Sequence, residues 1–187
     1  RLGNDTLNGA GGTDTVSYAN ASGGVTVSLA NQGVAGTDTS GAAGSDTLSN
    51  FENILGSASA DTLTGDANNN VIEGGLGNDT ISGGTGGTDT VSYAGADGAV
   101  TVNLAGQGVA GTDTTGAAGA DTLSNIDNVV GSQYNDTITG DGNANVLDGG
   151  FGADTLIGNA GADTLNGGIG NDTLMGGTGN DALNGGT

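Results

Sequence analysis

The chain has no Cys, His, Trp or Pro, and Arg1 is the one basic residue among its 187 residues. Without His, Cys or Lys it can form neither a Ser-His-Asp or Cys-His nucleophile nor a Schiff-base lysine, and it offers no His or Cys ligand to zinc, iron or copper. The scarcity of basic residues also disfavours binding to nucleic acid phosphates and excludes binding to anionic membrane surfaces. Carboxylates, hydroxyls and backbone carbonyls remain, and this oxygen-only set suits Ca²⁺ or Mg²⁺.

Aromatic residues are also scarce, at 3% of the chain, while 42 residues are Gly and the net charge is −20. A chain of this composition cannot build a conventional globular core. Low hydrophobicity combined with a large net charge is typical of disordered acidic tails. The strict periodicity of this sequence argues against disorder, but we expect the chain to need help, such as a bound ion, in order to fold.

The sequence contains a tandem repeat of 75 residues. Residues 9–82 align with residues 84–157 without a gap, and about two thirds of the aligned positions are identical. We therefore expect residues 1–187 to form one continuous stack of supersecondary units, with repeat units 9–83 and 84–158 and no linker between separate domains.

A shorter repeat of nine residues lies inside the longer one and runs without interruption through residues 131–187. Gly opens each unit, Asp or Asn occupies the sixth position, and one large aliphatic residue occupies the eighth. The sixth positions are Asp136, Asn145, Asp154, Asp163, Asp172 and Asp181, and in the first copy Asp61, Asn70 and Asp79. The eighth positions are Ile138, Leu147, Leu156, Leu165, Leu174 and Leu183.

A period of nine matches no helix, whereas three-residue strands between Gly-rich turns explain it. One such strand buries a single side chain, so units must coil and stack, with each aliphatic residue above its equivalent in the next turn. Thr at position seven then points outward. If two units make one turn, Asp154 stacks with Asp172, as Asp163 does with Asp181. Carboxylates about 4.8 Å apart, the spacing of strands, repel by about 3.5 kcal/mol at an effective dielectric constant of 20. A divalent ion between the turns converts this repulsion into ligation.

The remaining segments of each long repeat depart from the period of nine. Residues 25–29 and their copy alternate aliphatic and polar residues, which predicts a half-buried strand. Residues 46–55 and 121–130 place apolar residues three apart, a spacing that is also compatible with a helix. We favour strands with a bend at Asn50 or Asn125, because the following residues run straight into nonapeptides and a helix would break the stack.

Residues 167–175 read Gly-Gly-Ile-Gly-Asn-Asp-Thr-Leu-Met, and this unit and its neighbours resemble the G-G-x-G-x-D-x-U-x nonapeptide of RTX (hemolysin-type calcium-binding) proteins. The resemblance implies an all-β fold, a right-handed parallel β-roll or β-solenoid with several Ca²⁺ ions between its turns. It also implies ligation by the carbonyls at positions two and four and by the Asp at position six. In this sequence these residues are Gly75, Gly77 and Asp79, then Gly150, Gly152 and Asp154, Asn159, Gly161 and Asp163, Gly168, Gly170 and Asp172, and Gly177, Gly179 and Asp181.

Some units depart from the full motif. The set of expected metal ligands is completed by Asp61, Asp136, Asp14 and Asp89. Asp89 follows a turn with one extra residue, and Asp14 is its copy. Asn70 and Asn145 replace Asp in units that lack the second and fourth glycines, so we expect these turns to bind weakly or only to cap a neighbour.

The opposing interpretation is that Asp and Asn in these turns are only turn formers. Acidic residues for which the sequence favours neither interpretation are Asp38, Asp46, Asp113 and Asp121. Acidic residues that we interpret as solvated or as local turn caps are Asp66, Asp97, Asp127 and Asp141. We expect Tyr18 and Tyr93 to pack at a strand edge rather than to form a sugar-binding platform.

The resemblance and the duplication together predict a non-enzymatic, extracellular calcium-binding structural module, such as a stalk, adhesin, surface-layer or filament element. We expect it to be secreted, by the type I route that the family implies, to fold on binding calcium outside the cell, and to associate end to end with copies of itself. Nucleic acid binding and membrane insertion are not expected. An alternative is the calcium-dependent folding and secretion module of an RTX hydrolase whose catalytic domain lies outside this chain. A carboxylate-pair glycosidase is disfavoured by the few aromatic residues.

Overall fold

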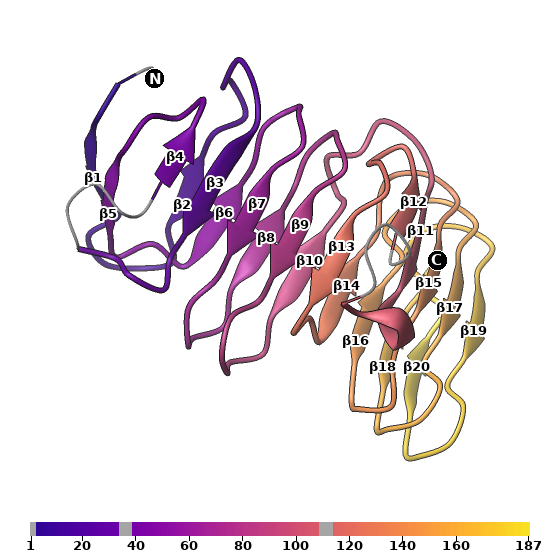
Figure 1. Ribbon diagram of the computed structural model, residues 1–187. Coiled ribbons are helices and arrows are strands. Elements are labelled where there is room, and N and C mark those ends of the chain that lie inside the picture. Colours follow the sequence, from indigo (N-terminus) through magenta and orange to yellow (C-terminus); the bar gives the residue numbers. More distant parts are fainter. Residues whose placement is uncertain (1–2, 34–38, 109–113) are drawn as a thin grey trace.

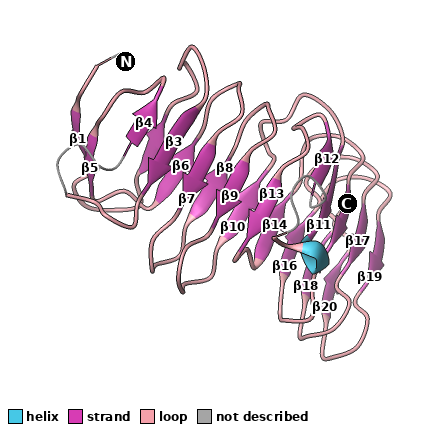
Figure 2. Cartoon of the chain, viewed as in Figure 1, coloured by secondary structure: helices cyan, strands magenta, loops and turns pink. Residues whose placement is uncertain are grey.

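A computed structural model of the chain describes residues 3–33, 39–108 and 114–187. Asp38 and Asp113 lie outside the described residues. The chain forms a stack of short strands that runs from β1 at one end to β19 and β20 at the other (Figure 1). Nearly all of the described backbone is strand or turn (Figure 2). Its one described helical element is the 3-10 turn η1 (Leu104–Gly106). This all-β arrangement of parallel strands is the predicted β-roll.

Successive strands alternate between one long sheet and a second series of sheets, except in one stretch of each long repeat, where three successive strands belong to the second series. The long sheet contains, in spatial order, β2 (Thr15–Ser17), β6 (Asn53–Leu55), β8 (Val71–Glu73), β10 (Thr90–Ser92), β14 (Asn128–Val130), β16 (Val146–Asp148), β18 (Thr164–Asn166) and β20 (Ala182–Asn184). The second series begins with the pair β1 (Thr6–Asn8) and β5 (Thr47–Ser49). It continues with the sheet β4 (Thr39–Gly41), β3 (Val25–Ser28), β7 (Thr62–Thr64), β9 (Thr80–Ser82) and β13 (Thr122–Ser124). The last sheet is β12 (Thr114–Gly116), β11 (Val100–Asn103), β15 (Thr137–Thr139), β17 (Thr155–Ile157) and β19 (Thr173–Met175).

The core is a ladder of aliphatic side chains, with one from the centre of most three-residue strands. Leu147 is in register with Leu165 in the parallel pair of β16 and β18, and both side chains are fully buried. On the other side Leu156 is in register with Leu174. Paired residues lie two nonapeptides apart, so the prediction that two units make one turn, or rung, is confirmed. Thr164 in β18 is exposed, as expected for a side chain on the outer face of the strand.

The irregular segments also form strands, as predicted. Val25 and Val27 of β3 are buried while Thr26 between them is exposed, which confirms the half-buried strand. Neither 46–55 nor 121–130 is helical. In each segment two strands meet at a bend where Asn takes a left-handed conformation, with φ +54° at Asn50 and +53° at Asn125.

Each long repeat contains a detour that the sequence did not predict. After β2 the chain forms β3, turns back through β4, which is antiparallel to β3, and then forms β5, which pairs with the earlier strand β1. The strand β7, formed later, then pairs with β3. The second copy repeats this path, with β12 antiparallel to β11. Because β4 runs antiparallel to β3, it brings the chain back to the rung of β1, where β5 then pairs.

Two tyrosines hold this detour against the roll. Tyr18 and Tyr93 are 6% and 3% exposed, and their hydroxyls donate to Asp46 Oδ2 at 3.0 Å and Asp121 Oδ2 at 3.1 Å. Their packing role is therefore confirmed. Within the described residues, no helix is long and apolar enough to cross a membrane.

Candidate metal centre

Acidic residues and their Asn replacements form two columns along the roll, each immediately before a strand. The first column, before the second series of strands, contains Asp5, Asp46, Asp61, Asp79, Asp121, Asp136, Asp154 and Asp172. The second column, before the strands of the long sheet, contains Asp14, Glu52, Asn70, Asp89, Asp127, Asn145, Asp163 and Asp181. The period of two nonapeptides per rung produces these columns, because every sixth position then falls at the same place on the turn.

In most of these carboxylates one oxygen accepts a backbone N–H from the neighbouring rung. The backbone N–H of Asp136 donates to Asp154 Oδ1 at 2.8 Å, and the N–H of Asp154 donates to Asp172 Oδ1 at 2.9 Å. In the other column the N–H of Asp163 donates to Asp181 Oδ1 at 3.1 Å. The predicted stacking of these residues is confirmed. The bonds place a carboxylate between each pair of rungs.

The second oxygen of several of these carboxylates is buried and accepts no hydrogen bond. These oxygens are Oδ2 of Asp14, Asp79, Asp154, Asp163 and Asp172. Burying a carboxylate oxygen without a partner is costly, because the protein supplies nothing in exchange for the lost water. Each such oxygen therefore requires either a proton or a cation.

Burial also makes ionisation of these groups harder. Desolvation raises the pKa of Asp79 to about 7. The hydrogen bond from the backbone N–H of Asp61 lowers this pKa, whereas the charges of Asp121 and Asp61 raise it further. Desolvation raises the pKa of Asp154 to about 6, and the neighbouring carboxylates of Asp136 and Asp172 add to the increase. Without a cation, a folded roll at neutral pH holds a column of mutually repelling charges.

Glycines shape the turn around these oxygens. Gly149 opens the unit of Asp154, and a Cβ at Gly149 would overlap Asp154 Oδ2. Gly168 has φ +95°, and a Cβ there would meet the carbonyl oxygen of Gly150 in the previous rung. That carbonyl accepts the N–H of Ile169 at 2.9 Å, which leaves it a second lone pair. The turns thus form a narrow cradle of backbone oxygens that side chains would fill.

The carboxylate oxygens of these turns fit a calcium ion if backbone carbonyls complete its coordination shell. Among the described residues, no group of three or more acidic side chains gathers closely enough to hold a metal ion by itself. A cation between rungs would meet an unpartnered carboxylate oxygen together with turn carbonyls, all of them hard oxygen donors. Ca²⁺ takes six to eight such oxygens in flexible geometry. When bound, it would neutralise the stacked carboxylates and tie adjacent turns together.

In other rungs the protein itself satisfies the turn. Asn145 Nδ2 donates to the Asp127 carbonyl at 2.7 Å, and Asn70 Nδ2 donates to the Glu52 carbonyl at 2.6 Å, so each amide caps its neighbour as expected. The predicted ligand Asp136 accepts Ser132 Oγ on Oδ1 at 2.8 Å and the Ser132 N–H on Oδ2 at 2.5 Å.

Further carboxylates have protein donors on both oxygens. Asp61, also a predicted ligand, has the same two bonds from Ser57 as Asp136 has from Ser132. Asp46 accepts the Asp5 N–H and the Tyr18 hydroxyl, and Asp121 is bonded in the corresponding way. Of the two interpretations left open for Asp46 and Asp121, these bonds favour a structural turn role.

The sequence pattern missed two members of the second column. The N–H of Asp89 donates to Asp127 Oδ2, and the N–H of Asp14 donates to Glu52 Oε2, both at 2.8 Å. The interpretation of Asp127 as solvated or as a local cap is therefore wrong. Both acids lie outside the period of nine, and the one available signal was their position immediately before an apolar strand.

The local caps were identified correctly elsewhere. Asp66 Oδ1 accepts the Asn68 N–H, and Asp141 Oδ1 accepts the Asn143 N–H, each two residues further along the chain. Asp97 is exposed.

One family model, described as the RTX calcium-binding nonapeptide repeat, matches this sequence in four copies, at residues 2–20, 55–91, 122–156 and 157–187. Together these segments cover more than half of the chain. They include every turn whose Asp Oδ2 is buried and unpartnered. No match was found among curated proteins.

Proposed function

Because the chain belongs to the RTX calcium-binding nonapeptide repeat family, we propose that it is an extracellular structural module that folds on binding several Ca²⁺ ions after secretion. In a longer protein it would serve as a stalk, adhesin, surface-layer or filament element. The calcium-binding repeat is the part of this function that the family establishes.

We assign the calcium ions to the turns between adjacent rungs. The first sites are those of Asp79, Asp154, Asp163 and Asp172, whose unpartnered oxygens face no protein donor. The carbonyls at positions two and four would complete the shell, as at Gly150 and Gly152. Asp61 and Asp136 come second, because Ser57 and Ser132 already donate to both of their carboxylate oxygens. The end site at Asp181 would need a further rung to close it.

The observation that carries this proposal is the run of buried, unpartnered carboxylate oxygens in a chain of net charge −20. A fold that depends on such groups is unfavourable without a cation and becomes stable once the cation binds. Extracellular calcium modules bind at roughly 10⁻⁴ to 10⁻³ M, so the same chain would stay unfolded in the cytosol and fold outside.

A structural role is supported by the repeated architecture. The long sheet passes through both copies of the 75-residue repeat, and we propose that residues 1–187 form one solenoid whose repeated modules add length. Further copies could stack end to end, with calcium between their terminal turns.

Circular dichroism with and without calcium tests the proposal. We expect a disordered spectrum in excess chelator and a β spectrum on adding millimolar Ca²⁺, reversible on chelation. The matched control is Mg²⁺ at the same concentration and ionic strength, which separates ligation from screening of charge. A β spectrum that persists unchanged in chelator would overturn calcium-dependent folding.

A further inference from the structure

The chain has three Tyr and two Phe residues, and the two aromatic residues that are exposed lie on adjacent rungs. Tyr18, Tyr93 and Phe51 are buried, whereas Tyr134 and Phe151 are 47% and 54% exposed. These two belong to the turns before β15 and β17, which are paired strands in one column of the roll. Exposed aromatic side chains that lie together are a feature of binding surfaces.

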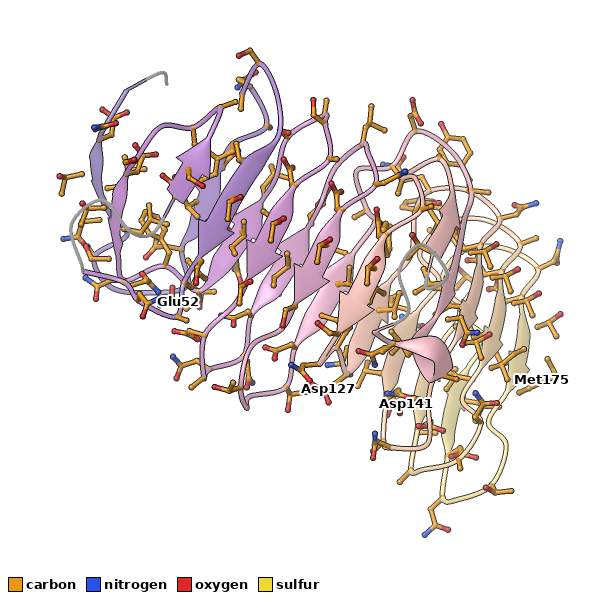
Figure 3. The ribbon with its side chains drawn as sticks, in the orientation of Figure 1. Glu52, Asp127, Asp141 and Met175 are labelled. Atoms are coloured by element: carbon orange, nitrogen blue, oxygen red, sulfur yellow. The ribbon has the colours of Figure 1, made fainter. Side chains whose placement is uncertain are left out.

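Backbone contacts show how closely the exposed residues lie. A Cβ at Gly152 would meet the Tyr134 carbonyl, so the residue after Phe151 lies directly over Tyr134. Phe151 also forms a parallel bridge with Ile169 in the next rung, and Ile169 is 51% exposed. Diagonal neighbours on paired strands are within reach of aromatic side chains. We call these three side chains, Tyr134, Phe151 and Ile169, the aromatic edge. They belong to the end of the roll where Figure 3 labels Met175 of β19.

The fold itself does not require large apolar residues at these positions. The other column of turns forms the same kind of parallel bridge between Ala160 and Thr178. The bridge that joins Phe151 to Ile169 therefore forms equally well from small or polar residues. Since the pairing of the turns does not select these side chains, we look to a partner for the reason that they are present.

The aromatic edge occurs in the second long repeat alone. The residue equivalent to Phe151 in the first repeat is Leu76, which is 42% exposed. The turns stacked on either side of Leu76 carry Ala58 and Ala118, so it has no large exposed neighbour in this column. A single exposed aliphatic residue is normal on a protein surface, and Leu76 therefore serves as a matched control.

The charge beside the aromatic edge determines which partner fits. Asp148 Oδ1 accepts the Gly150 N–H at 3.1 Å, which fixes this carboxylate at the start of the turn that contains Phe151. The chain has a net charge of −20, and its one basic residue is Arg1. A second copy would bring the same negative charge to the contact and would be repelled, whereas a cationic partner is attracted. Aromatic faces also bind cations, and they stack well with Arg guanidinium groups.

We propose that the aromatic edge is a docking surface for a cationic, Arg-containing polypeptide segment. Arg side chains of the partner stack on Tyr134 and Phe151, one guanidinium pairs with Asp148, and Ile169 contributes apolar contact. Aromatic residues and Arg are the residue types that carry most of the affinity in protein interfaces. This surface adds the capture of a basic partner to the structural role of the roll.

A fluorescent synthetic peptide of alternating Arg and Gly residues tests the surface. Its affinity is measured by anisotropy in millimolar Ca²⁺ at low ionic strength, where charge attraction is least screened. Phe151→Ser should weaken binding at least fivefold, while Leu76→Ser, which also removes an exposed apolar side chain, should match the unmodified chain. Phe151→Leu keeps an apolar residue but removes the ring, and it should weaken binding at least twofold. The β spectrum of each chain in calcium is recorded first, so that a failure to fold is distinguished from a failure to bind.

Two charge variants separate docking from general attraction to an acidic protein. Asp148→Asn keeps an oxygen that can accept the Gly150 N–H, and it should weaken binding more than Asp97→Asn, which makes the same charge change at an exposed residue elsewhere. Equal weakening by the two Asn variants, with no effect of Phe151→Ser, would show that net charge alone attracts the peptide and would overturn the docking surface. A folded chain that binds no peptide would also overturn it. So would concentration-dependent dimers that Phe151→Ser abolishes, because a second copy would then occupy the aromatic edge.

Discussion

At the scale of single residues, the choice between Asp and Asn at position six decides whether a turn depends on an ion. Asp154 leaves one oxygen buried and unpartnered, whereas Asn145, in the adjacent unit, donates Nδ2 to the Asp127 carbonyl. Position six of the turn is thus completed by a cation in the unit of Asp154 and by an amide hydrogen in the unit of Asn145. Replacing Asp by Asn should exchange calcium dependence for an internal hydrogen bond.

Asp154→Asn should therefore have opposite effects in calcium and in chelator. In excess calcium the free energy of unfolding should fall by about 2–3 kcal/mol, because a site filled at a hundred times its Kd contributes about 2.7 kcal/mol. In chelator the variant should have more residual β-structure than the unmodified chain, because a buried charge has been removed. Denaturant titrations in both conditions measure this. Equal effects in both would contradict a metal role for Asp154.

The raised carboxyl pKa values give calcium binding a pH dependence with a defined sign. The folded metal-free chain holds its proton on Asp79 up to a pKa of about 7, while an unfolded Asp releases it near 3.9. Stability without calcium should therefore fall as the pH rises from about 4 to about 7.

Calcium affinity should change in the opposite direction, because the ion binds the ionised form. Between pH 8 and pH 5.5, affinity at the Asp79 site should fall by about thirtyfold for a pKa of about 7. The shift must be measured on the folded chain, by calcium titration at the two pH values under partial chelation that leaves the β spectrum intact, because an unfolded Asp is ionised at both. Asp79→Asn is the control, and its midpoint should vary less with pH.

At the scale of elements, each strand is too short to be stable alone, so the turns must stack as closely as the strands. Gly168 has φ +95° and leaves no room for a Cβ against the Gly150 carbonyl. Gly142, in the degenerate unit of Asn145, has open space around its Cα. The glycines of the complete motif therefore have a steric function that those of the degenerate units lack.

Gly168→Ala should destabilise the calcium-bound roll by about 1–3 kcal/mol, the usual cost of a residue with a Cβ in a sparsely populated backbone region. Gly142→Ala should change stability by no more than about 0.5–1 kcal/mol, with either sign. Urea unfolding in calcium compares the two. Similar losses in both variants would mean that close approach of turns is not what selects Gly at position two.

Much of the element order could be predicted because the nine-residue period determines it directly. Strand length, the stacking of Leu147 on Leu165 and the paired carboxylates all follow from that period. The antiparallel strands β4 and β12 and the column positions of Glu52 and Asp127 do not. The antiparallel strands depend on pairing with the strand immediately before them, and Glu52 and Asp127 depend on contacts across 38 residues; neither kind of contact follows the nine-residue period. Deciding which Asp residues lack a partner likewise needed the positions of Ser57 and Ser132.

At the scale of the whole molecule, the roll is close to one-dimensional, because each rung contacts chiefly the rungs beside it. In such a stack, stability is a sum of the intrinsic terms of the rungs and the terms between neighbours. Three of the unpartnered carboxylates, those of Asp154, Asp163 and Asp172, lie in consecutive units near one end of the roll, whereas Ser, Asn or Tyr donors complete several of the earlier turns. Withdrawing calcium should therefore open the roll unevenly instead of melting it as a unit.

Hydrogen exchange during stepwise chelation should reveal this order. Both β15, which follows Asp136 with its Ser132 donors, and β17, which follows Asp154, are inside the stack with paired strands on both sides. We expect the amides of β17 to lose protection at a higher free calcium concentration than those of β15. Mass spectrometry of peptides from each strand measures the two midpoints.

Ser132→Ala tests whether the serine causes the difference. The substitution removes the Oγ donor to Asp136 Oδ1 but keeps the N–H that donates to Oδ2. One lost hydrogen bond to a charged group costs about 1.5–3 kcal/mol, enough to bring β15 close to the midpoint of β17. If β15 and β17 already lose protection together in the unmodified chain, serine does not substitute for calcium. The rungs would then be coupled strongly enough to fold as a single unit, whatever their individual donors.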